Sequence, residues 1–181
     1  MPRPAGYTAA MERRQREALI RKYSQGPRRL RAAFAKAPAA ARTWRPGPGK
    51  WSALEVLGHC ADSELNAAAR ARYLIGEAQP QIVGYDQDQW AVVFDYHQQR
   101  PAHCFALLDA VVDHTVAALR RAPASAWQKP GRHSEREGPY TLETWLGIYA
   151  QHMANHAGQI ERNVKAWRAQ ARGRTRLARR R

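Results

Sequence analysis

The sequence predicts an all-α protein folded as a four-helix bundle. Four stretches place apolar residues at steps of three and four, the repeat of one helix face, and turn-forming residues separate them. No stretch shows the apolar-polar alternation of a strand, and no internal repeat stands out. At 181 residues the chain is long enough for one ordinary domain with a hydrophobic core. Amphipathic helices of this length bury their apolar faces against one another in a bundle.

The first helix is predicted over about residues 8–37. Gly26 and Pro27 interrupt its pattern, which leaves open a kinked helix or two shorter ones. The proline- and glycine-rich residues 44–50 that follow cannot be helical.

The second helix is predicted from Ser52 to about residue 76. Ser52 can cap it through its hydroxyl, and Glu55, three residues on, completes a capping box. Residues 80–99 then form a long connection, with room for a helical turn around residues 90–96. A connection of this length permits a crossover, so the second and third helices need not be adjacent and antiparallel.

The third and fourth helices complete the bundle. The third begins at Pro101, a residue favoured in the first turn, and runs to about Arg121. A polar loop over residues 130–139 leads to the fourth, which is predicted from Thr141, a suitable cap, to about Trp167.

The net charge of +15 is concentrated at the two ends of the chain. Residues 1–50 carry a net +11 and residues 161–181 a net +8, whereas residues 51–160 carry a net −4. The arginine-rich end can bind the phosphate backbone of nucleic acid without sequence preference, although a solvated end explains it as well and is the interpretation we favour.

We expect three parts in the chain. Residues 1–7 form a disordered N-terminus, residues 8–168 the bundle, and residues 169–181 a disordered arginine-rich tail with almost no apolar content.

The composition points to a cytoplasmic protein. No run approaches the roughly 18 apolar residues of a membrane span, and the N-terminus lacks the apolar stretch of a signal peptide. Cys60 and Cys104 lack the spacing of a metal or redox motif and the density of a disulfide scaffold, so both are expected as reduced core thiols.

His152 and His156 are the most informative residues. Four residues apart on a helix, they point the same way and can bind one metal ion. They also share a face with apolar residues that enter the core, and burying an imidazole without a partner costs about 1–3 kcal/mol. The alternative is a pair of core histidines hydrogen-bonded to neighbouring groups.

A third ligand is expected from the second helix, where His59 lies among inward-facing apolar residues. Three protein ligands with an open position are typical of catalytic zinc. The pair on the fourth helix lacks the glutamate of the zinc-protease motif, so an acid or base must come from elsewhere. Asp62, one turn after His59, could orient an imidazole. Gln159, one turn beyond His156, could hydrogen-bond a metal-bound water.

Several motifs in order resemble the DinB superfamily, and within it the YfiT-like branch of metal-dependent hydrolases. The resemblance spans about residues 10–167 and rests on these segments: Trp44 to Pro46, Lys50 to Glu64, Tyr85 to Trp90, and Tyr149 to Ile160. It implies a bundle with up-down-down-up connectivity and, in many relatives, a homodimer. It also implies a divalent metal, nickel or zinc, on the residues matching His59, His152 and His156.

The resemblance suggests further pocket residues. Tyr85, Asp86 and Trp90 match a loop that covers the metal pocket in relatives; alternatively, Trp90 fills the core and Asp86 caps a short helix. His133 falls in the loop before the fourth helix and could act as an acid or base near neutral pH, although a surface position is the commoner outcome.

Three functions compete. The leading one is a metal-dependent enzyme acting on a small molecule, either a hydrolase or a transferase that uses a low-molecular-weight thiol, as in characterised members of the family. The second is a non-catalytic stress or binding protein in which a metal stabilises the bundle, with Asp62 or Cys60 as a fourth ligand. The third is association with nucleic acid through the arginine-rich ends.

Overall fold

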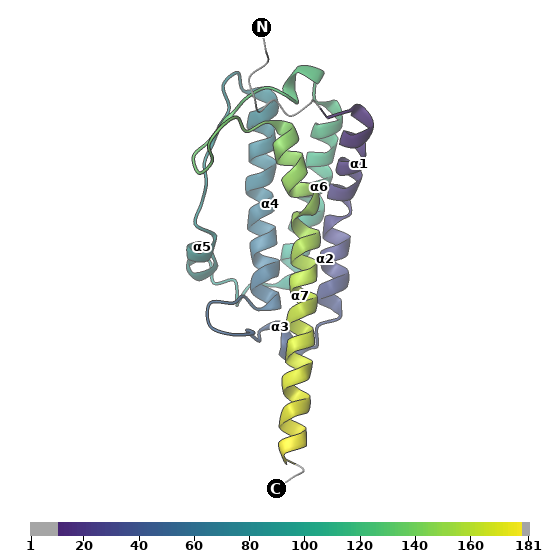
Figure 1. Ribbon diagram of the computed structural model, residues 1–181, viewed down its shortest axis with the longest axis vertical. Helices are drawn as coiled ribbons and strands as arrows, with labels where there is room; N and C mark the ends of the chain where they lie inside the picture. The colour runs from purple at the N-terminus through teal and green to yellow at the C-terminus, as the bar shows by residue number, and fades with distance from the viewer. Residues whose placement is uncertain (1–10, 179–181) are drawn as a thin grey trace, which may run out of the picture.

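The computed structural model describes residues 11–178, the last five by their backbone alone, and shows the predicted bundle of long helices. Two helices placed end to end form one member of the bundle (Figure 1): α1 (Arg13–Ser24) and α2 (Gly26–Ala35). The other three members are single helices: α4 (Ala53–Gly76), α6 (Pro101–Arg121) and α7 (Leu142–Ala178). α4 and α6 run in the same direction, opposite to the other two members, which is the up-down-down-up connectivity (Figure 1).

The capping residues act where the sequence predicted. The Ser52 hydroxyl accepts a hydrogen bond from the Glu55 backbone N–H, and the Glu55 carboxylate accepts one from the Ser52 backbone N–H. This capping box sets the first residue of α4. Pro101 is the first residue of α6, as expected, because the N–H that proline lacks has no partner in the first turn of a helix.

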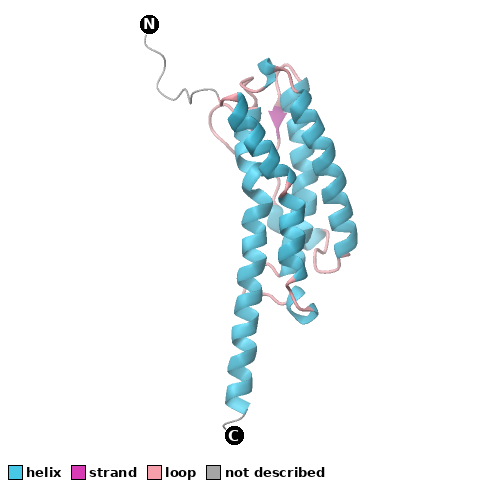
Figure 2. Cartoon of the chain, turned by 90° about the vertical axis from the view of Figure 1, so that its right-hand side faces the viewer, coloured by secondary structure: helices cyan, strands magenta, loops and turns pink. Residues whose placement is uncertain are grey.

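The connection between α4 and α6 runs along the outside of the bundle and carries short elements (Figure 1). They are β1 (Gln81–Ile82) and α5 (Gln87–Val93). β1 pairs in parallel with β2 (Arg132–His133), near the end of the bundle where α7 begins (Figure 2). Two further short helices lie at the ends of the bundle: α3 (Ala39–Arg42) and η1 (Ala124–Ala126). Strands of two residues are too short to show alternation in the sequence.

Tyr96 anchors this connection to the bundle. Its ring is fully buried against Gly58 of α4, where an added Cβ would come within 2.9 Å of the ring. Its hydroxyl donates a hydrogen bond of 2.8 Å to Asp62 of the same helix. The glycine is therefore required by close packing rather than by an unusual backbone angle.

The core is formed by one face of each long helix, with Trp145, Tyr23 and Leu108 among its largest fully buried side chains. Both cysteines are free and buried, as predicted. Within residues 11–178, α6 alone has the length and mean hydropathy of a membrane-spanning helix, but these criteria do not distinguish a span from a core helix. Its buried side chains, such as Leu108 and Val112, pack within the hydrophobic core.

Three details differ from the sequence analysis or complete it. The chain divides into two helices at Gly26, which settles the alternative left open there. α7 continues to Ala178, so residues 169–178 are helical where a disordered tail was expected. Alanine, arginine and glutamine have high helix propensity, and an existing helix extends at little cost even without core contacts. The predicted disordered segments 1–7 and 179–181 lie outside the described residues.

Candidate metal centre

Three histidines from two helices converge in the structure. His59 lies in the second turn of α4, and His152 and His156 lie one turn apart on α7. The Nε2 atoms of His59 and His152 are 3.3 Å apart, and one ring nitrogen from each of the three lies within 4.8 Å of the others. Two nitrogens bound tetrahedrally to zinc, each about 2.0–2.1 Å from the ion, would be about 3.4 Å apart. The closest pair is therefore already at ligand spacing.

The surroundings keep two of these imidazoles neutral. Burial, followed by the neighbouring histidines, lowers the pKa of His59 to about 2. Burial and His152 likewise lower the pKa of His156 to about 4, although its hydrogen bond to Gln159 opposes the shift. A neutral imidazole has a free lone pair, which is the form that binds a metal.

Neighbouring side chains set the orientation of the rings. Nδ1 of His156 donates a hydrogen bond of 2.9 Å to Oε1 of Gln159. The proton is therefore on Nδ1, and Nε2 of His156 has the free lone pair. Gln159 thus contacts the His156 ring through its side-chain oxygen. The Trp51 ring lies against that of His59, with 4.7 Å between the centroids, and covers one side of it.

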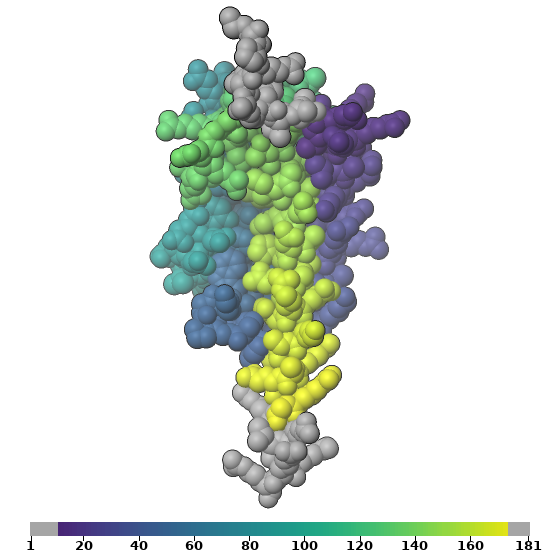
Figure 3. All heavy atoms as spheres, viewed as in Figure 1, coloured from purple at the N-terminus to yellow at the C-terminus, as the bar shows by residue number. Residues whose placement is uncertain are grey.

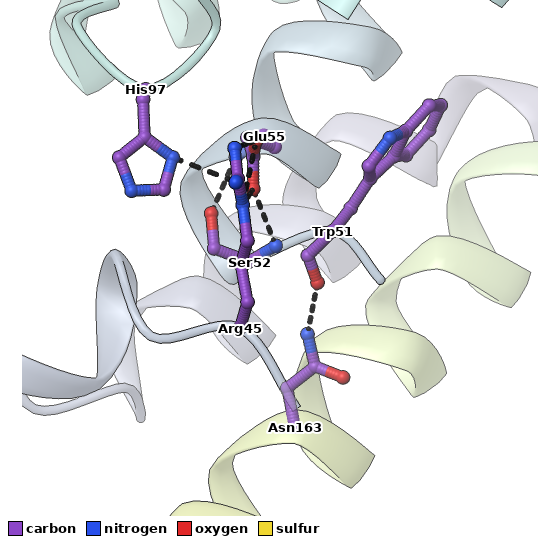
Figure 4. Close-up of polar contacts among 6 residues, drawn as sticks. All are labelled: Arg45, Trp51, Ser52, Glu55, His97 and Asn163. Atoms are coloured by element: carbon purple, nitrogen blue, oxygen red, sulfur yellow. Dashed lines mark hydrogen bonds and ion pairs between the residues drawn. The ribbon is translucent and has the colours of Figure 1, made fainter. Parts of the chain in front are cut away.

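Polar contacts hold the backbone at Trp51 and at the next residue, Ser52 (Figure 4). The Trp51 backbone carbonyl accepts a hydrogen bond of 2.8 Å from the side chain of Asn163 on α7. The next residue, Ser52, is tied to Glu55, which also accepts hydrogen bonds from Arg45 and lies 3.4 Å from Nδ1 of His97. The start of α4, and with it the indole over His59, is fixed to both the preceding loop and α7.

A cavity of about 500 Å³ opens beside two of the histidines. Its walls come from α4, α7, the connection before α5 and the loop before α7, and its lining includes His59, Ser63, Arg70, Tyr85, Glu135, Tyr149 and His152. Arg70 donates hydrogen bonds to the Tyr149 hydroxyl and to the Val83 carbonyl, which ties the connection to both helices. The cavity thus combines the guanidinium of Arg70, three carboxylates from Asp86, Asp88 and Glu135, several hydroxyls and two of the clustered imidazoles.

The loop that was expected to cover the pocket contributes two of its three predicted residues to the lining. Tyr85 and Asp86 line the cavity. The Asp86 side chain also caps α5, because it accepts hydrogen bonds from the backbone N–H groups of Asp88 and Gln89. Trp90 is not among the lining residues; it stacks on Tyr85 with 4.3 Å between ring centroids, half-buried rather than filling the core.

The structure separates Asp62 and His133 from the histidine cluster. Asp62 accepts the hydrogen bond of Tyr96 and lines a different cavity, next to Cys104. His133 is buried, its Nδ1 accepts a hydrogen bond from the Glu135 backbone, and it does not line the cavity. Burial, with a smaller contribution from nearby arginines, lowers the pKa of His133.

Two residues near the histidines were missed by the sequence analysis. Glu64 is fully buried on α4, and its Oε1 lies 3.7 Å from Nδ1 of His152. Its place on the inward face with Leu57 and Cys60 was a signal that a carboxylate enters the core. Trp51 gave no such signal, because its contact with His59 depends on the path of the loop before α4.

The site fits a divalent cation. Neither Glu64 Oε1 nor His152 Nδ1 has a hydrogen-bond partner among the described residues. A buried carboxylate without compensation is costly, and a cation on the opposite side of the imidazole would offset its charge. Neutral nitrogen donors suit zinc and nickel, among other transition metals.

Comparison with known proteins identifies the family of this chain. The profile of the DinB superfamily matches residues 22–160, which is most of the chain. This chain belongs to the DinB superfamily. Over 112 residues it is 30% identical to a candidate metal-dependent hydrolase of Oceanobacillus iheyensis and to YfiT of Bacillus subtilis, a protein with the same designation. These matches cover 62% of this chain and 64% and 63% of the two relatives.

Other comparisons extend over more of the chain. A candidate metal-dependent hydrolase of Bacillus licheniformis is 27% identical over 158 residues, 85% of this chain and 88% of the relative. The solved structure of Bacillus subtilis YfiT, described as having an unusual four-helix bundle topology, superposes with a TM-score of 0.80 at 24% identity over 91% of each chain. A mycothiol-dependent maleylpyruvate isomerase superposes with a TM-score of 0.65 at 12% identity, over 80% of this chain and 60% of that one. These two structures show the shared DinB-like fold.

Proposed function

We propose that this chain is a metal-dependent enzyme acting on a small molecule, with a divalent ion, zinc or nickel, held by His59, His152 and His156. The observation that carries the proposal is the convergence of the three imidazoles beside an open cavity of about 500 Å³. A cavity of this volume is in the range used for small-molecule ligands. Relatives named for metal-dependent hydrolysis support the same conclusion.

The metal would supply a Lewis acid that brings the pKa of a bound water or thiol close to neutrality, which suits both hydrolysis and transfer to a low-molecular-weight thiol. The other tasks fall to the chain's own residues. Trp51 shields one side of His59 from water. The guanidinium of Arg70 lies in the cavity wall, where it can bind an anionic group of the substrate. The hydroxyls of Tyr85 and Ser63 line the same cavity and can orient polar groups.

A purely structural metal is less well supported. A closed structural site needs a fourth protein ligand. In the described part of the chain the cluster contains three histidines and no fourth histidine, cysteine or carboxylate. Of the two residues considered for this role, Cys60 is buried in the hydrophobic core and Asp62 is bonded to Tyr96. An open coordination position favours catalysis.

Metal analysis tests the proposal directly. Tag-free wild-type protein, after supply of zinc or nickel and removal of free ions, should contain one equivalent of metal. His59→Ala and His152→Ala should lose it, whereas His114→Ala, which changes an exposed histidine of α6, should retain it. Loaded and chelated wild-type protein are then compared on ester and amide hydrolysis and on thiol transfer to electrophiles. Absence of metal from the wild type would overturn the proposal, and metal without any metal-dependent turnover would favour the structural role.

A further inference from the structure

A buried polar chain leads from the histidine cluster into the centre of the bundle. The hydroxyl of Tyr23, on α1, donates a hydrogen bond of 2.7 Å to Oε2 of Glu64, on α4. The other oxygen of Glu64 faces Nδ1 of His152, on α7, at 3.7 Å. Tyr23 and Glu64 are both fully buried. Side chains from three members of the bundle therefore form a continuous series of polar contacts, which ends at the His152 imidazole of the cluster.

The hydrogen-bonding capacity of Tyr23 and Glu64 indicates which nitrogen of His152 carries the proton. A phenol hydroxyl can satisfy one oxygen of the carboxylate, and the second oxygen then requires another donor. Nδ1 of His152, 3.7 Å away, can supply it. When that nitrogen carries the proton, the opposite nitrogen, Nε2, has the lone pair, and it is Nε2 that lies 3.3 Å from Nε2 of His59. A carboxylate behind a metal-binding histidine fixes the tautomer and the ring orientation and raises the basicity of the ligand.

We propose that Glu64 and Tyr23 are positioning residues of the metal centre: Glu64 orients His152 and compensates the charge of the ion, and Tyr23 holds Glu64 in place. This inference rests on the proposed metal site. A structural role alone would explain the bond between Tyr23 and Glu64, but not the second oxygen directed at a ligand of the cluster.

The test is the metal affinity of Glu64→Gln and Tyr23→Phe, measured by competition with a chromophoric chelator for zinc. We expect Glu64→Gln to weaken binding by about 10–100-fold, the range for such outer contacts, and Tyr23→Phe to weaken it by less. Glu143→Gln is the matched control: this buried carboxylate lies near the start of α7, where it accepts hydrogen bonds from Gln128 and the Met11 backbone. Glu143→Gln should lower the free energy of unfolding without changing the affinity for zinc.

The outcomes separate this inference from the proposed function. Wild-type affinity in both Glu64→Gln and Tyr23→Phe would overturn the inference while leaving the metal site in place. A wild-type protein that binds no zinc or nickel would overturn both. If Glu64→Gln fails to fold, Tyr23→Phe decides the matter, because it preserves the carboxylate and removes a single oxygen atom. The absorption spectrum of the cobalt-loaded protein adds a readout of ligand geometry, which should change in Tyr23→Phe and stay as in the wild type in Glu143→Gln.

An independent observation concerns the opposite side of α7. A groove of about 500 Å³ between α2 and α7 is lined by four basic residues, one acidic residue and small apolar ones: Lys36, Lys165, Arg168, Arg172, Glu161, Ala33, Val164 and Ala169. It lies towards the C-terminal part of α7, which extends beyond the rest of the bundle (Figures 1 and 3).

The positive charge of this groove is only partly neutralised. Lys36 forms an ion pair of 2.9 Å with Glu161. The side chains of Lys165 and Arg172 have no hydrogen-bond or ion-pair partner among the residues that the structure describes. The guanidinium of Arg168 donates one hydrogen bond of 3.3 Å to the Lys36 backbone carbonyl. Lys165, Arg168 and Arg172 follow one another at steps of three and four, so they share one face of the helix. Glu161 is the last acidic residue of the sequence.

We infer that this groove and the adjoining face of α7 bind the phosphate backbone of nucleic acid. None of these three side chains is neutralised by a carboxylate among the described residues, and a row of such cations attracts closely spaced phosphates and releases their counterions. A membrane-binding helix needs several large apolar side chains that enter the lipid, whereas the apolar residues that line this groove are two alanines and a valine. The phosphate contacts predict binding without sequence preference.

The test is binding of a short, fluorescently labelled DNA duplex of arbitrary sequence, followed by anisotropy over a range of salt concentrations. Wild-type affinity should fall steeply with salt, and the variant K165E/R168E/R172E should bind at least about tenfold more weakly with a smaller salt dependence. A control with the same net charge, R13E/R14E/K22E, reverses three residues of α1 and should bind within about threefold of the wild type. Equal losses in both variants, or tighter binding to phosphatidylserine vesicles than to the duplex, would overturn the inference.

Discussion

The side chain of Asn163 donates a hydrogen bond of 2.8 Å to the backbone carbonyl of Trp51 (Figure 4). The two residues are far apart in the sequence, one on α7 and the other just before α4. The bond links α7 to the residue just before α4, and so holds the backbone of the residue whose indole covers His59. The geometry of the cluster thus depends on a polar contact outside it.

Asn163→Ala should therefore disturb both stability and the indole. The variant leaves a partly buried carbonyl without its donor, and the loss of such a hydrogen bond costs about 0.5–1.5 kcal/mol. We expect a lower free energy of unfolding in urea and a shift in tryptophan fluorescence. Asn66→Ala is the control, because Asn66 donates to a carbonyl within its own helix and does not contact Trp51. An unchanged unfolding free energy in Asn163→Ala would contradict this account.

The carboxylate of Glu55 should make stability depend on pH in the acid range. Burial would raise its pKa, but hydrogen bonds from Arg45 and Ser52 outweigh burial and lower it from 4.5 to about 2. A folded-state pKa below the unfolded one stabilises the protein above pH 4.5, and this stabilisation is lost as the pH falls from 4.5 to about 2. Glu55→Gln should remove it, at a cost on the order of 2 kcal/mol at pH 7.

Urea unfolding of Glu55→Gln and wild type between pH 2 and 7 measures this effect. The two stability curves should converge towards low pH. Glu17→Gln is the matched control, since Glu17 forms exposed ion pairs with Arg21 and Arg120, and such pairs contribute about 0–1 kcal/mol. Parallel curves for wild type and Glu55→Gln would show that the carboxylate is not stabilised as described.

Two glycines in helices should respond oppositely to alanine. Gly58→Ala places a methyl group within 2.9 Å of the fully buried Tyr96 ring, and such overpacking costs about 1–3 kcal/mol. Gly147→Ala, on α7, meets no atom within 4 Å and should gain up to about 1 kcal/mol from helix propensity. Thermal unfolding measures both. A stabilised Gly58→Ala variant would mean that Tyr96 does not pack as described.

Gln159 should affect the metal through His156 rather than through the substrate. In Gln159→Leu, Nδ1 of His156 loses its acceptor, and the ring is no longer held with Nε2 free. We expect zinc affinity to fall by about tenfold or more, as for other contacts behind a ligand. Gln151→Leu, at an exposed position on the same helix, should bind zinc like the wild type. Equal affinities in both variants would exclude this role of Gln159.

The sequence predicted the helices best where local chemistry determines them. The capping box of Ser52 and the proline at residue 101 placed the starts of α4 and α6 within one residue. The pairing of His152 with His156 followed from helical spacing alone. His59 was found because it was the polar exception on an inward face, and the structure brings it next to the other two.

Features that depend on how the helices meet could not be predicted. The approach of Glu64 to His152 requires the relative placement of α4 and α7. The position of Trp51 against His59 depends on the path of a loop. Asp62 was assigned to the same neighbourhood from its place one turn after His59, but the buried Tyr96 of the connection binds it instead. Local periodicity contains none of this information.

All three histidines belong to α4 and α7, whereas the connection that carries Tyr85 and Asp86 passes outside the bundle. The scaffold that would hold a metal is therefore separate from a segment that shapes the cavity. Natural selection, or an engineer, could exchange residues 77–95 for another sequence without rebuilding the helices, provided that Tyr96 still packs on Gly58. A common bundle with replaceable connections would allow one metal-binding framework to evolve toward many different substrates.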